Sequence, residues 1–431
     1  MQVPENRISS LLDPFQRFGV HLGLARIKQL LEVLDNPQDR VLIIHVAGTN
    51  GKGSVCAYLA SILTEAGYRV GRYTSPHLVD WTERICLNQQ EIPASDLAKI
   101  LEDIQSAIAS YPAETENPTQ FEVITAAAWL YFARSRVDLA VMEVGLGGRL
   151  DATNVKDNPL VSTIISLSLE HWQRLGPTVA DIAREKAGVI KPNRPVIVGQ
   201  LPTSAMEVVK ARAKEMNAPL TVVEPAVEIE IPGSTTTWAK YRDLEYPLPL
   251  LGAIQLGNSA IAIAAIQTLQ QQGWEIPDLA IQTGINKTRW RARVEWTTWN
   301  NQPLLIDGAH NPAAAIALRQ YANTLDRPIT WIMGMLSTKD HRDIFAALLK
   351  PKDELHLVPV PDHSTAEPEE LAQLAQQVCP RLDRCQTHQD VFTALDLVFD
   401  DRTETRSRAV ILCGSLYLLG HVLQYAASRS S

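Results

Sequence analysis

VLIIHV-AGTNGKGS-VCAYLASILTEAG, residues 41–67, joins an apolar run to a helix-compatible segment through a loop with three glycines. The run predicts a buried strand and the segment after Ser54 predicts a helix. Glycines at 48, 51 and 53 let backbone N–H groups approach a phosphate, the helix start adds positive charge, and Lys52 reaches the β- and γ-phosphates. The alternative is a tight strand-to-helix turn, which needs no lysine between its glycines. The stretch therefore predicts a phosphate-binding loop, although Gly53 after the lysine departs from the strict G-x-x-x-x-G-K-[ST] pattern.

The same alternation of β-branched runs, polar loops and helix-period stretches recurs along the chain, as in parallel α/β sheets. β-prone sequence interrupts it between Val222 and Pro249, a long helix is expected over Gln255 to Gln271, and a second alternation follows Trp296. We predict an α/β protein with an N-terminal P-loop ATPase-like domain, residues 1–296, with a mostly parallel sheet. A smaller Rossmann-like α/β domain, residues 297–431, follows it. The expected strands are residues 41–46, 69–73, 139–144, 161–166, 195–198, 304–306, 329–333, 354–357 and 409–413, and residues 113–119 and 400–408 are expected to be surface loops.

Length and composition favour a two-domain cytoplasmic protein. The 431 residues exceed what one hydrophobic core normally holds. A net charge of -8 disfavours nucleic acid and anionic membranes as partners, and no stretch approaches the ~20 apolar residues of a membrane span. The five cysteines are scattered, without C-x-x-C spacing, which argues against disulfides and zinc. We expect a monomer in the cytoplasm.

The segment HVAGTNGKGSV, His45 to Val55, resembles the ATP loop of the folylpolyglutamate synthase and dihydrofolate synthase family, relatives of the Mur ligases. Six further segments resemble family motifs, in the family's order: YTSPHL (73–78), FEVITAAAW (121–129), MEVGLGGRLDATN (142–154), EKAGVIKP (185–192), DGAHNP (307–312) and GSLYLLG (414–420). The resemblance implies an ATP-dependent, magnesium-requiring ligase that joins L-glutamate to the carboxylate of a folate or of dihydropteroate. It makes the first domain the Mur ligase-like ATP-binding domain and the second the C-terminal ligase domain. The implied ATP contacts in the loop are Gly48, Thr49, Asn50, Gly51, Lys52, Gly53 and Ser54.

Glu143 follows a predicted buried strand, and so lies at the carboxyl edge of the sheet, where α/β folds assemble ligand sites. A buried acid needs a partner, and the alternative is a carboxylate tied to an arginine or a backbone amide. The resemblance instead makes Glu143 a Mg²⁺ ligand together with His171 and Ser75. His171 could equally be a packed or capping residue, and Glu170 before it stands where relatives commonly have aspartate. Oxygen ligands of this kind suit Mg²⁺.

Asp307 and His310 follow a strand of the second domain and precede a helix. Helix capping is the alternative for them, because Asp and Asn are common N-caps. The resemblance implies that both reach ATP from the second domain. It also implies that Arg293 contacts phosphate, although Arg-Ala stands where the family has Pro-Gly before this arginine, and that Asn258 lies near the adenine or ribose beside Gln255. The family's histidine in that run is Ile254 here.

A folate pocket is expected at Phe121, Pro76 and His77, since aromatic faces suit a flat heterocycle. For Phe121 the alternative is a core position at the start of an apolar helix. Lys186 matches the lysine that carries a carbamate in the family, and the alternative is an exposed helical lysine beside Glu185. The implied catalytic residues are Lys52, Glu143, His171 and Lys186.

Two rival functions stay open at this point. One is a Mur-type ligase that adds an amino acid to a UDP-sugar peptide, against which the GKGS form and the early position of the ATP loop argue. The other is a P-loop phosphotransferase or nucleotide-binding regulator without ligase chemistry. ADP release that requires both a folate and glutamate separates them. The residues do not choose between dihydropteroate and a reduced folate as the first substrate, nor do they fix the length of the glutamate chain.

Overall fold

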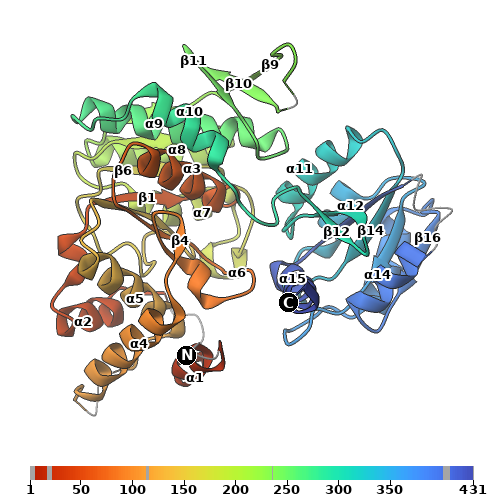
Figure 1. The fold of residues 1–431 in the computed structure, drawn as a ribbon, viewed down its shortest axis with the longest axis horizontal. Coiled ribbons are helices and arrows are strands. Elements are labelled where there is room, and N and C mark those ends of the chain that lie inside the picture. The colour runs from red at the N-terminus through yellow and green to blue at the C-terminus, as the bar shows by residue number, and fades with distance from the viewer. Residues whose placement is uncertain (1–4, 17–21, 113–115, 235, 401–407, 431) are drawn as a thin grey trace. The chain divides into compact units, whose positions relative to one another are not determined.

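The computed structural model describes residues 5–16, 22–112, 116–234, 236–400 and 408–430 (Figure 1). The chain forms two compact units: unit 1 comprises residues 1–249 and 255–289, and unit 2 comprises residues 250–254 and 290–431. The boundary predicted at 296/297 falls inside the first strand of unit 2. The functions assigned to the two predicted domains stay predictions.

Unit 1 is built on an eight-stranded sheet with the strand order β4-β3-β2-β5-β1-β6-β7-β8. Its strands from β2 to β8 in that order are parallel, whereas β3 and β4 add an antiparallel edge. The sheet confirms the mostly parallel arrangement and the five strands predicted for this part of the chain. The bounds are β1 (Ile43–Ala47), β2 (Val70–Tyr73), β3 (Ile85–Leu87), β4 (Gln90–Glu91), β5 (Leu139–Glu143), β6 (Val161–Ile164), β7 (Val196–Val198) and β8 (Leu220–Val222).

Helices pack around this sheet, and α3, α9 and α10 lie together in Figure 1 while α2, α4 and α5 form a separate group. α3 packs against β1, β2 and β5 and is covered by α10, and α5 contacts α2 and α4. The bounds are α1 (Glu5–Gln16), α2 (Ala25–Val33), η1 (Pro37–Arg40), α3 (Lys52–Glu65), η2 (Trp81–Arg84), α4 (Ala94–Ala109), α5 (Gln120–Arg134), α6 (Trp172–Leu175), α7 (Val179–Lys186), η3 (Ala187–Val189), α8 (Thr203–Glu215), α9 (Ile254–Gln271) and α10 (Asp278–Lys287).

Local sequence fixes where the helices next to the candidate site begin. Thr119 and Glu122 form a capping box at α5, in which each side chain accepts the other residue's backbone N–H. The sequence T-V-A-D, residues 178–181, predicts a capping box at the start of α7, and Thr178 and Asp181 form it. An N-cap of this kind is worth about 1 kcal/mol. The two boxes therefore set the register of the helices that carry Phe121 and Lys186.

The β-prone interval between Val222 and Pro249 forms a small antiparallel sheet, β11-β10-β9, at the top of unit 1 in the view of Figure 1. Its strands are β9 (Val227–Ile229), β10 (Trp238–Tyr241) and β11 (Leu244–Pro247). α10 packs on β11, and the chain continues into α9. The prediction of an interrupting β segment followed by a long helix is therefore confirmed.

Unit 2 contains a six-stranded sheet with the order β12-β13-β17-β14-β15-β16, parallel except for the edge strand β12. Asn311 caps α11 by accepting the N–H of Ala314, and Pro312 occupies the first helical position. The bounds are β12 (Glu295–Trp299), β13 (Gln302–Ile306), α11 (Pro312–Asn323), β14 (Ile329–Met333), α12 (His341–Leu348), β15 (Glu354–Leu357), α13 (Pro368–Val378), β16 (Arg384–Thr387), α14 (Val391–Asp400), β17 (Ala409–Cys413) and α15 (Leu416–Ser430). The second α/β alternation is confirmed.

Residues 113–115 and 401–407 of the two predicted surface loops, 113–119 and 400–408, lie outside the described residues. In the first loop, residues 116–117 are exposed, as predicted, whereas Pro118 and Thr119 are buried because the chain enters α5 there. Within the described part of the chain, no helix is long and apolar enough to cross a membrane. The expected monomeric state and cytoplasmic location stay predictions.

Candidate active site

The glycine-rich loop joins β1 to α3 at the carboxyl edge of the unit 1 sheet, as predicted. Gly51 precedes α3 with φ +87°, a conformation that residues with a side chain rarely adopt. A Cβ on Gly51 would lie 2.4 Å from the Asn258 side-chain oxygen. Asn258 in turn donates to Gln255 at 3.0 Å, and both side chains are buried. The start of α9 therefore packs directly against the loop, which explains why glycine is required here.

The loop backbone is held from the neighbouring strand end. Thr49 N–H donates to the Ser166 carbonyl at 2.7 Å, and Asn50 N–H donates to the Ser166 hydroxyl oxygen at 3.0 Å. Ser166 returns a hydrogen bond to the Asn50 carbonyl at 2.9 Å. Its position directly after a buried strand was the available sequence signal, but sequence reasoning did not single it out. The first hydrogen bond within α3 runs from the Val55 N–H to the Gly51 carbonyl. The N–H groups of residues 52–54 come before it and have no carbonyl one turn earlier to bond to. Such N–H groups at the start of a helix commonly bind an anion.

Lys52 and Glu143 lie together at this edge. The Lys52 ammonium is 3.9 Å from a Glu143 carboxylate oxygen and donates to the Thr49 carbonyl at 3.1 Å. Glu143 is buried at the end of β5, and its other oxygen accepts the Ser75 N–H at 3.3 Å. The structure thus brings together Lys52, Glu143 and Ser75 from three segments. The backbone amide partner anticipated as the alternative for Glu143 is present, which leaves its role as a metal ligand a prediction.

His171 lies at the start of α6, with φ +51° and its imidazole 4.0 Å from a Glu170 oxygen. Its side chain is 46% exposed, in contrast to buried Glu143. It occupies the N-cap position of α6 but makes no side-chain capping bond. Among the described residues, no group of three or more His, Cys, Asp or Glu side chains is arranged to hold a metal. The predicted Mg²⁺ ligands are Ser75, Glu143 and His171, and only the last two are of these four residue types. A group of this composition is not excluded by that result, so their role as ligands stays a prediction.

Lys186 is buried, which makes the alternative of an exposed helical lysine wrong. Its ammonium donates to the Gly48 carbonyl of the phosphate-binding loop at 2.7 Å. Burial and the nearby Lys52 cation lower the pKa of Lys186 to about 7, against the opposing effect of Glu170, Asp151 and Glu143. A substantial fraction of this amine is therefore neutral near pH 7.

The glycine-rich segment after β5 packs against the end of α7 and buries Lys186. A Cβ on Gly148 would lie 2.9 Å from the Glu185 carbonyl oxygen, and a Cβ on Gly188 would lie 2.3 Å from the Arg149 Cβ. The Asn154 side chain donates to both the Arg149 and Gly188 carbonyls at 3.1 Å. The motifs around Gly148 and Lys186, which are far apart in sequence, therefore form one folded cluster.

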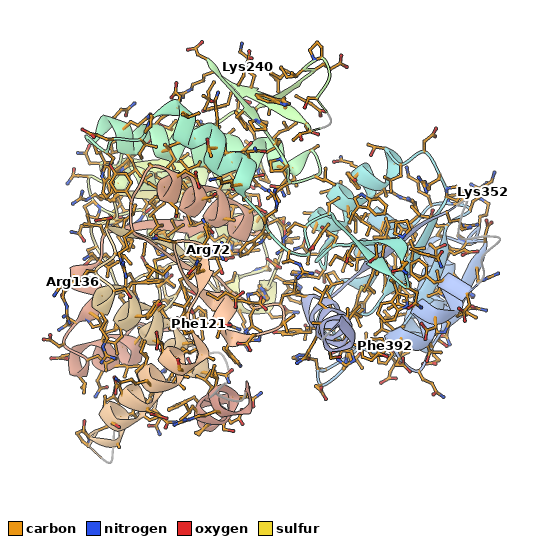
Figure 2. All side chains as sticks on the ribbon, in the orientation of Figure 1. Arg72, Phe121, Arg136, Lys240, Lys352 and Phe392 are labelled. Atoms are coloured by element: carbon orange, nitrogen blue, oxygen red, sulfur yellow. The ribbon has the colours of Figure 1, made fainter. Side chains whose placement is uncertain are left out.

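Phe121 and His77 both belong to unit 1. Phe121 lies at the start of α5, where Figure 2 labels it, and His77 lies in the loop between β2 and η2. A Cβ on Gly145 would lie 2.4 Å from the Phe121 ring, so only glycine allows this packing. Phe121 is half-buried and packs against the hydrophobic core that contains residues of α2, α4 and α5. The alternative prediction, that Phe121 is a core residue, is therefore partly correct. Pro76 is exposed. Whether the three residues bind folate stays a prediction.

His77 contacts two residues that sequence reasoning missed. Its Nδ1 accepts a hydrogen bond from Arg84 Nε at 2.9 Å, and its ring lies 4.5 Å from the Trp81 ring. Burial and the Arg84 cation lower the pKa of His77 to about 3. The sequence signal was their position in the nearby turn DWTER, but the pattern alone did not reveal which side chain they contact.

In unit 2, Asp307 and Arg293 come together at the end of β13. The Asp307 carboxylate accepts the N–H groups of Val294 at 2.9 Å and Ala309 at 2.8 Å. Burial raises the pKa of Asp307, while the Arg293 cation opposes that shift. The N-cap of α11 is Asn311, so the capping alternative is wrong for Asp307. His310 is half-buried, and its Nδ1 bonds to the Gly308 carbonyl at 2.8 Å.

Substitution of Gly51 by alanine is expected to lower ATP affinity and ligase turnover by about 100-fold, because displacing a bound group by even 1 Å has an effect of that size. The added Cβ would collide with Asn258. Gly67→Ala is the matched control, since Gly67 has φ +90° with nothing within 4 Å of its Cβ position. Calorimetry with ATP analogues checks this. Equal, small losses in both variants would show that backbone strain alone matters.

Comparisons with known proteins identify the family. The model of the Mur ligase middle domain matches residues 46–266, and that of the dihydrofolate synthetase C-terminal domain matches residues 291–425. The dihydrofolate synthetase of Saccharomyces cerevisiae is 34% identical over 430 residues, covering 94% of this chain and 98% of the relative. The dihydrofolate synthase/folylpolyglutamate synthase of Escherichia coli is 33% identical over 432 residues, covering 98% and 95%.

Solved structures give the same result. The Mycobacterium tuberculosis folylpolyglutamate synthase complexed with ADP has a TM-score of 0.86 and 29% identity, covering 98% of both chains. Escherichia coli FolC in complex with DHPP and ADP has a TM-score of 0.84 and 30% identity, covering 100% of both. This chain is therefore a ligase that belongs to the dihydrofolate synthetase and folylpolyglutamate synthase family of Mur ligase relatives.

Proposed function

We propose that this chain uses ATP to join the α-amine of L-glutamate to the carboxylate of a folate or of dihydropteroate. The observation that carries the proposal is the convergence of Lys52, Glu143 and Lys186 on one phosphate-binding loop in unit 1. The relatives' names and the ADP and DHPP complexes of the similar structures support the substrate classes.

In the first step, a carboxylate oxygen of the folate substrate attacks the γ-phosphorus of ATP, and ADP leaves. The product is an acyl phosphate. Lys52 compensates the charge on the transferring phosphate, and the N–H groups at the start of α3 hold the phosphates, so positioning and electrostatics supply most of the rate. Glycine at positions 51 and 53 places no side chain beside these N–H groups, which suits a bound phosphate.

In the second step, the neutral α-amine of glutamate attacks the acyl carbon. The carbon–oxygen bond to phosphate breaks, inorganic phosphate leaves with the electron pair, and the amine nitrogen loses a proton as the amide forms. Water must stay away from the acyl phosphate, because its hydrolysis would waste the ATP. The buried setting of Glu143 and Lys186 next to the loop fits that requirement.

The donors near Lys52 fit Mg²⁺ better than a softer metal. Glu143 offers a buried carboxylate, Ser75 lies beside it, and oxygen ligands completed by waters and phosphates are what Mg²⁺ prefers. We assign Glu143, Ser75 and His171 to hold it, His171 being the exposed member of the set. When bound, Mg²⁺ neutralises charge on the β- and γ-phosphates.

Lys186 is proposed to carry a carbamate. The ammonium first loses a proton, and the lone pair of the neutral amine then attacks the carbon of CO₂. Loss of a second proton from the nitrogen leaves a carbamate, which is an anionic oxygen donor. The buried setting favours this reaction, because only the neutral amine reacts. Beside Lys52, a carbamate also replaces the repulsion between two cations by attraction.

Asn258 of unit 1 and Arg293, Asp307 and His310 of unit 2 are proposed nucleotide contacts. Asn258 supports this role through its approach to Gly51, and Arg293 through its closeness to Gly308, whose Cβ position lies 2.6 Å from the Arg293 guanidinium. Asp307 holds the backbone next to Arg293 by accepting the Val294 N–H. Arg293 would supply a cation to the phosphates or the ribose, and Asn258, Asp307 and His310 would supply three further polar groups.

Asp307→Asn is expected to weaken ATP-analogue binding by about tenfold, because an amide cannot accept both N–H groups and each lost buried bond costs about 1–3 kcal/mol. Asp390→Asn is the control, since Asp390 accepts the N–H and hydroxyl of Thr393 elsewhere in unit 2. Calorimetry on both variants measures the effect. Unchanged affinity in Asp307→Asn would remove Asp307 from the nucleotide contacts.

The reaction itself is tested by product analysis. Purified protein with ATP, Mg²⁺ and glutamate is incubated separately with dihydropteroate and with a reduced folate. Mass spectrometry is expected to show a glutamate added to at least one of them. Phosphorylated substrate without any glutamate adduct would instead identify a phosphotransferase.

A further inference from the structure

Arg84 lies between His77 and the residues that contact Phe121. It is the last residue of η2, directly before β3, and it is half-buried. Its Nε donates to His77 Nδ1 at 2.9 Å, and its guanidinium lies close enough to the buried Tyr73 hydroxyl for its charge to act on it. The Arg84 guanidinium carbon lies 4.4 Å from the centre of the Trp81 ring, within cation–π distance.

The bond from Arg84 determines the hydrogen positions on His77. A guanidinium has only donors, so Nδ1 must accept through its lone pair. The ring is then neutral, with its hydrogen on Nε2. Within the described part of the chain, Nε2 makes no hydrogen bond. The Trp81 ring, 4.5 Å away, fixes the plane of the imidazole. The His77 ring is therefore held in one orientation, and its Nε2–H is available to donate a hydrogen bond to a ligand.

A chain of hydrogen bonds leads from Tyr73, beside Arg84, to Phe121. The Thr125 hydroxyl donates to the Phe121 carbonyl at 2.7 Å, so it must accept from the Tyr73 hydroxyl, 2.9 Å away. The Tyr73 oxygen keeps its lone pairs for the neighbouring Arg84 cation. The two hydrogen bonds of this chain therefore point in one direction, from Tyr73 to the backbone of Phe121.

We propose that Arg84 is a positioning residue for the folate substrate. It fixes the loop that carries His77 against the helix that carries Phe121, and it presents His77 Nε2–H to a hydrogen-bond acceptor on the flat heterocycle–aminobenzoate portion. The proposal rests on the proposed function, because that function supplies the substrate. Arg84 itself touches no reacting atom in this account.

Three variants test the proposal. Arg84→Met keeps the length of the side chain but removes every donor, and Arg84→Lys keeps the charge with a single donor group. Arg72→Met is the matched control, because Arg72 comes from the adjacent strand and donates to Gln89 at 2.9 Å and Cys86 at 3.0 Å; Figure 2 labels Arg72. Steady-state kinetics with the folate substrate and with ATP are compared, together with ring-nitrogen NMR of His77.

Arg84→Met is expected to raise the KM for the folate substrate by about 10- to 100-fold, the effect of losing a charged hydrogen bond. The kcat and the KM for ATP should change little, Arg84→Lys should lie between, and Arg72→Met should resemble wild type. NMR should show only the Nε2–H form of His77 in wild type and a mixture of both tautomers in Arg84→Met.

An unchanged folate KM in Arg84→Met would overturn the proposal, as would an equal loss in Arg72→Met, which would show a merely structural effect. A wild-type protein without folate-dependent ADP formation would overturn the proposed function instead. The NMR measurement needs no substrate, so it would still decide whether Arg84 controls His77. A wild-type His77 with its hydrogen on Nδ1 would refute that link.

Discussion

Lys52→Ala is expected to lower ADP formation in the presence of folate and glutamate by about 10³-fold, within the range seen when a cation is removed from a transferring phosphate. The Lys52 side chain is 16% exposed and lies at the start of α3 next to Glu143. Lys52 and buried Lys186 each donate to a carbonyl of this loop. The fold should stay intact, because Lys52 takes no part in a core cluster.

Lys240→Ala controls for the loss of a lysine in general. Lys240 is a partly exposed residue on β10, labelled in Figure 2, and it pairs with Glu245 at 2.9 Å. Ion pairs that water can reach contribute little to stability, so turnover and melting temperature should match wild type. Near wild-type turnover in Lys52→Ala, with an unchanged melting temperature, would refute the assignment of the phosphate-binding loop.

Lys186→Met is the second large effect expected, with turnover falling by about 100-fold or more, as when one charged group is removed from a preorganised site. Methionine retains much of the length of the side chain but cannot form a carbamate. Wild-type activity should fall in CO₂-depleted buffer and recover with bicarbonate, whereas the variant should not respond. A ¹³C NMR signal from labelled bicarbonate on Lys186, independent of activity, checks the modification directly.

Lys191→Met is the control for this experiment, because Lys191 lies a few residues further along the chain and pairs with exposed Asp157 at 3.0 Å. It should keep both its activity and its response to bicarbonate. A fully active Lys186→Met variant, or a wild type without a carbamate signal at saturating bicarbonate, would refute the carbamate.

The lowered pKa of Lys186 also makes a stability prediction for the unmodified protein. The pKa is about 7 in the folded chain and ordinarily 10.5, so between these values the unfolded chain binds a proton that the folded chain lacks. The free energy of unfolding therefore rises with pH through this window and is not affected by this group below it. In CO₂-free buffer, the melting temperature of wild type minus that of Lys186→Met should increase as the pH rises from 7 toward 10. Parallel curves would show that Lys186 titrates normally.

Much of the scaffold could be predicted from the sequence because it follows local rules. β-branched runs gave the parallel strands, and the spacing T-V-A-D gave the capping box of α7. The phosphate-binding loop was recognisable because its three glycines and Lys52 serve one local conformation. In unit 2, the segment DGAHNP was placed correctly between β13 and α11.

Local patterns do not show the parts of the site that depend on contacts between distant segments. Without the family resemblance, Lys186 next to Glu185 reads as an exposed helical lysine, but it is buried where Gly148 packs against the end of α7. Arg84 reads as an ordinary charged residue in a turn, because nothing local shows that it donates to His77. The exposure of His171 likewise depends on where the short helix α6 lies. Such contacts join residues that no periodic pattern relates.

ADP release by purified wild-type protein tests the central claim most directly. ATP and Mg²⁺ are supplied with a folate or dihydropteroate, with glutamate, with both, or with neither. The account predicts rapid ADP release only when the carboxylate substrate and glutamate are both present, since the amine consumes the acyl phosphate and allows turnover. Equal release when glutamate is omitted, or when the folate is omitted, would contradict it.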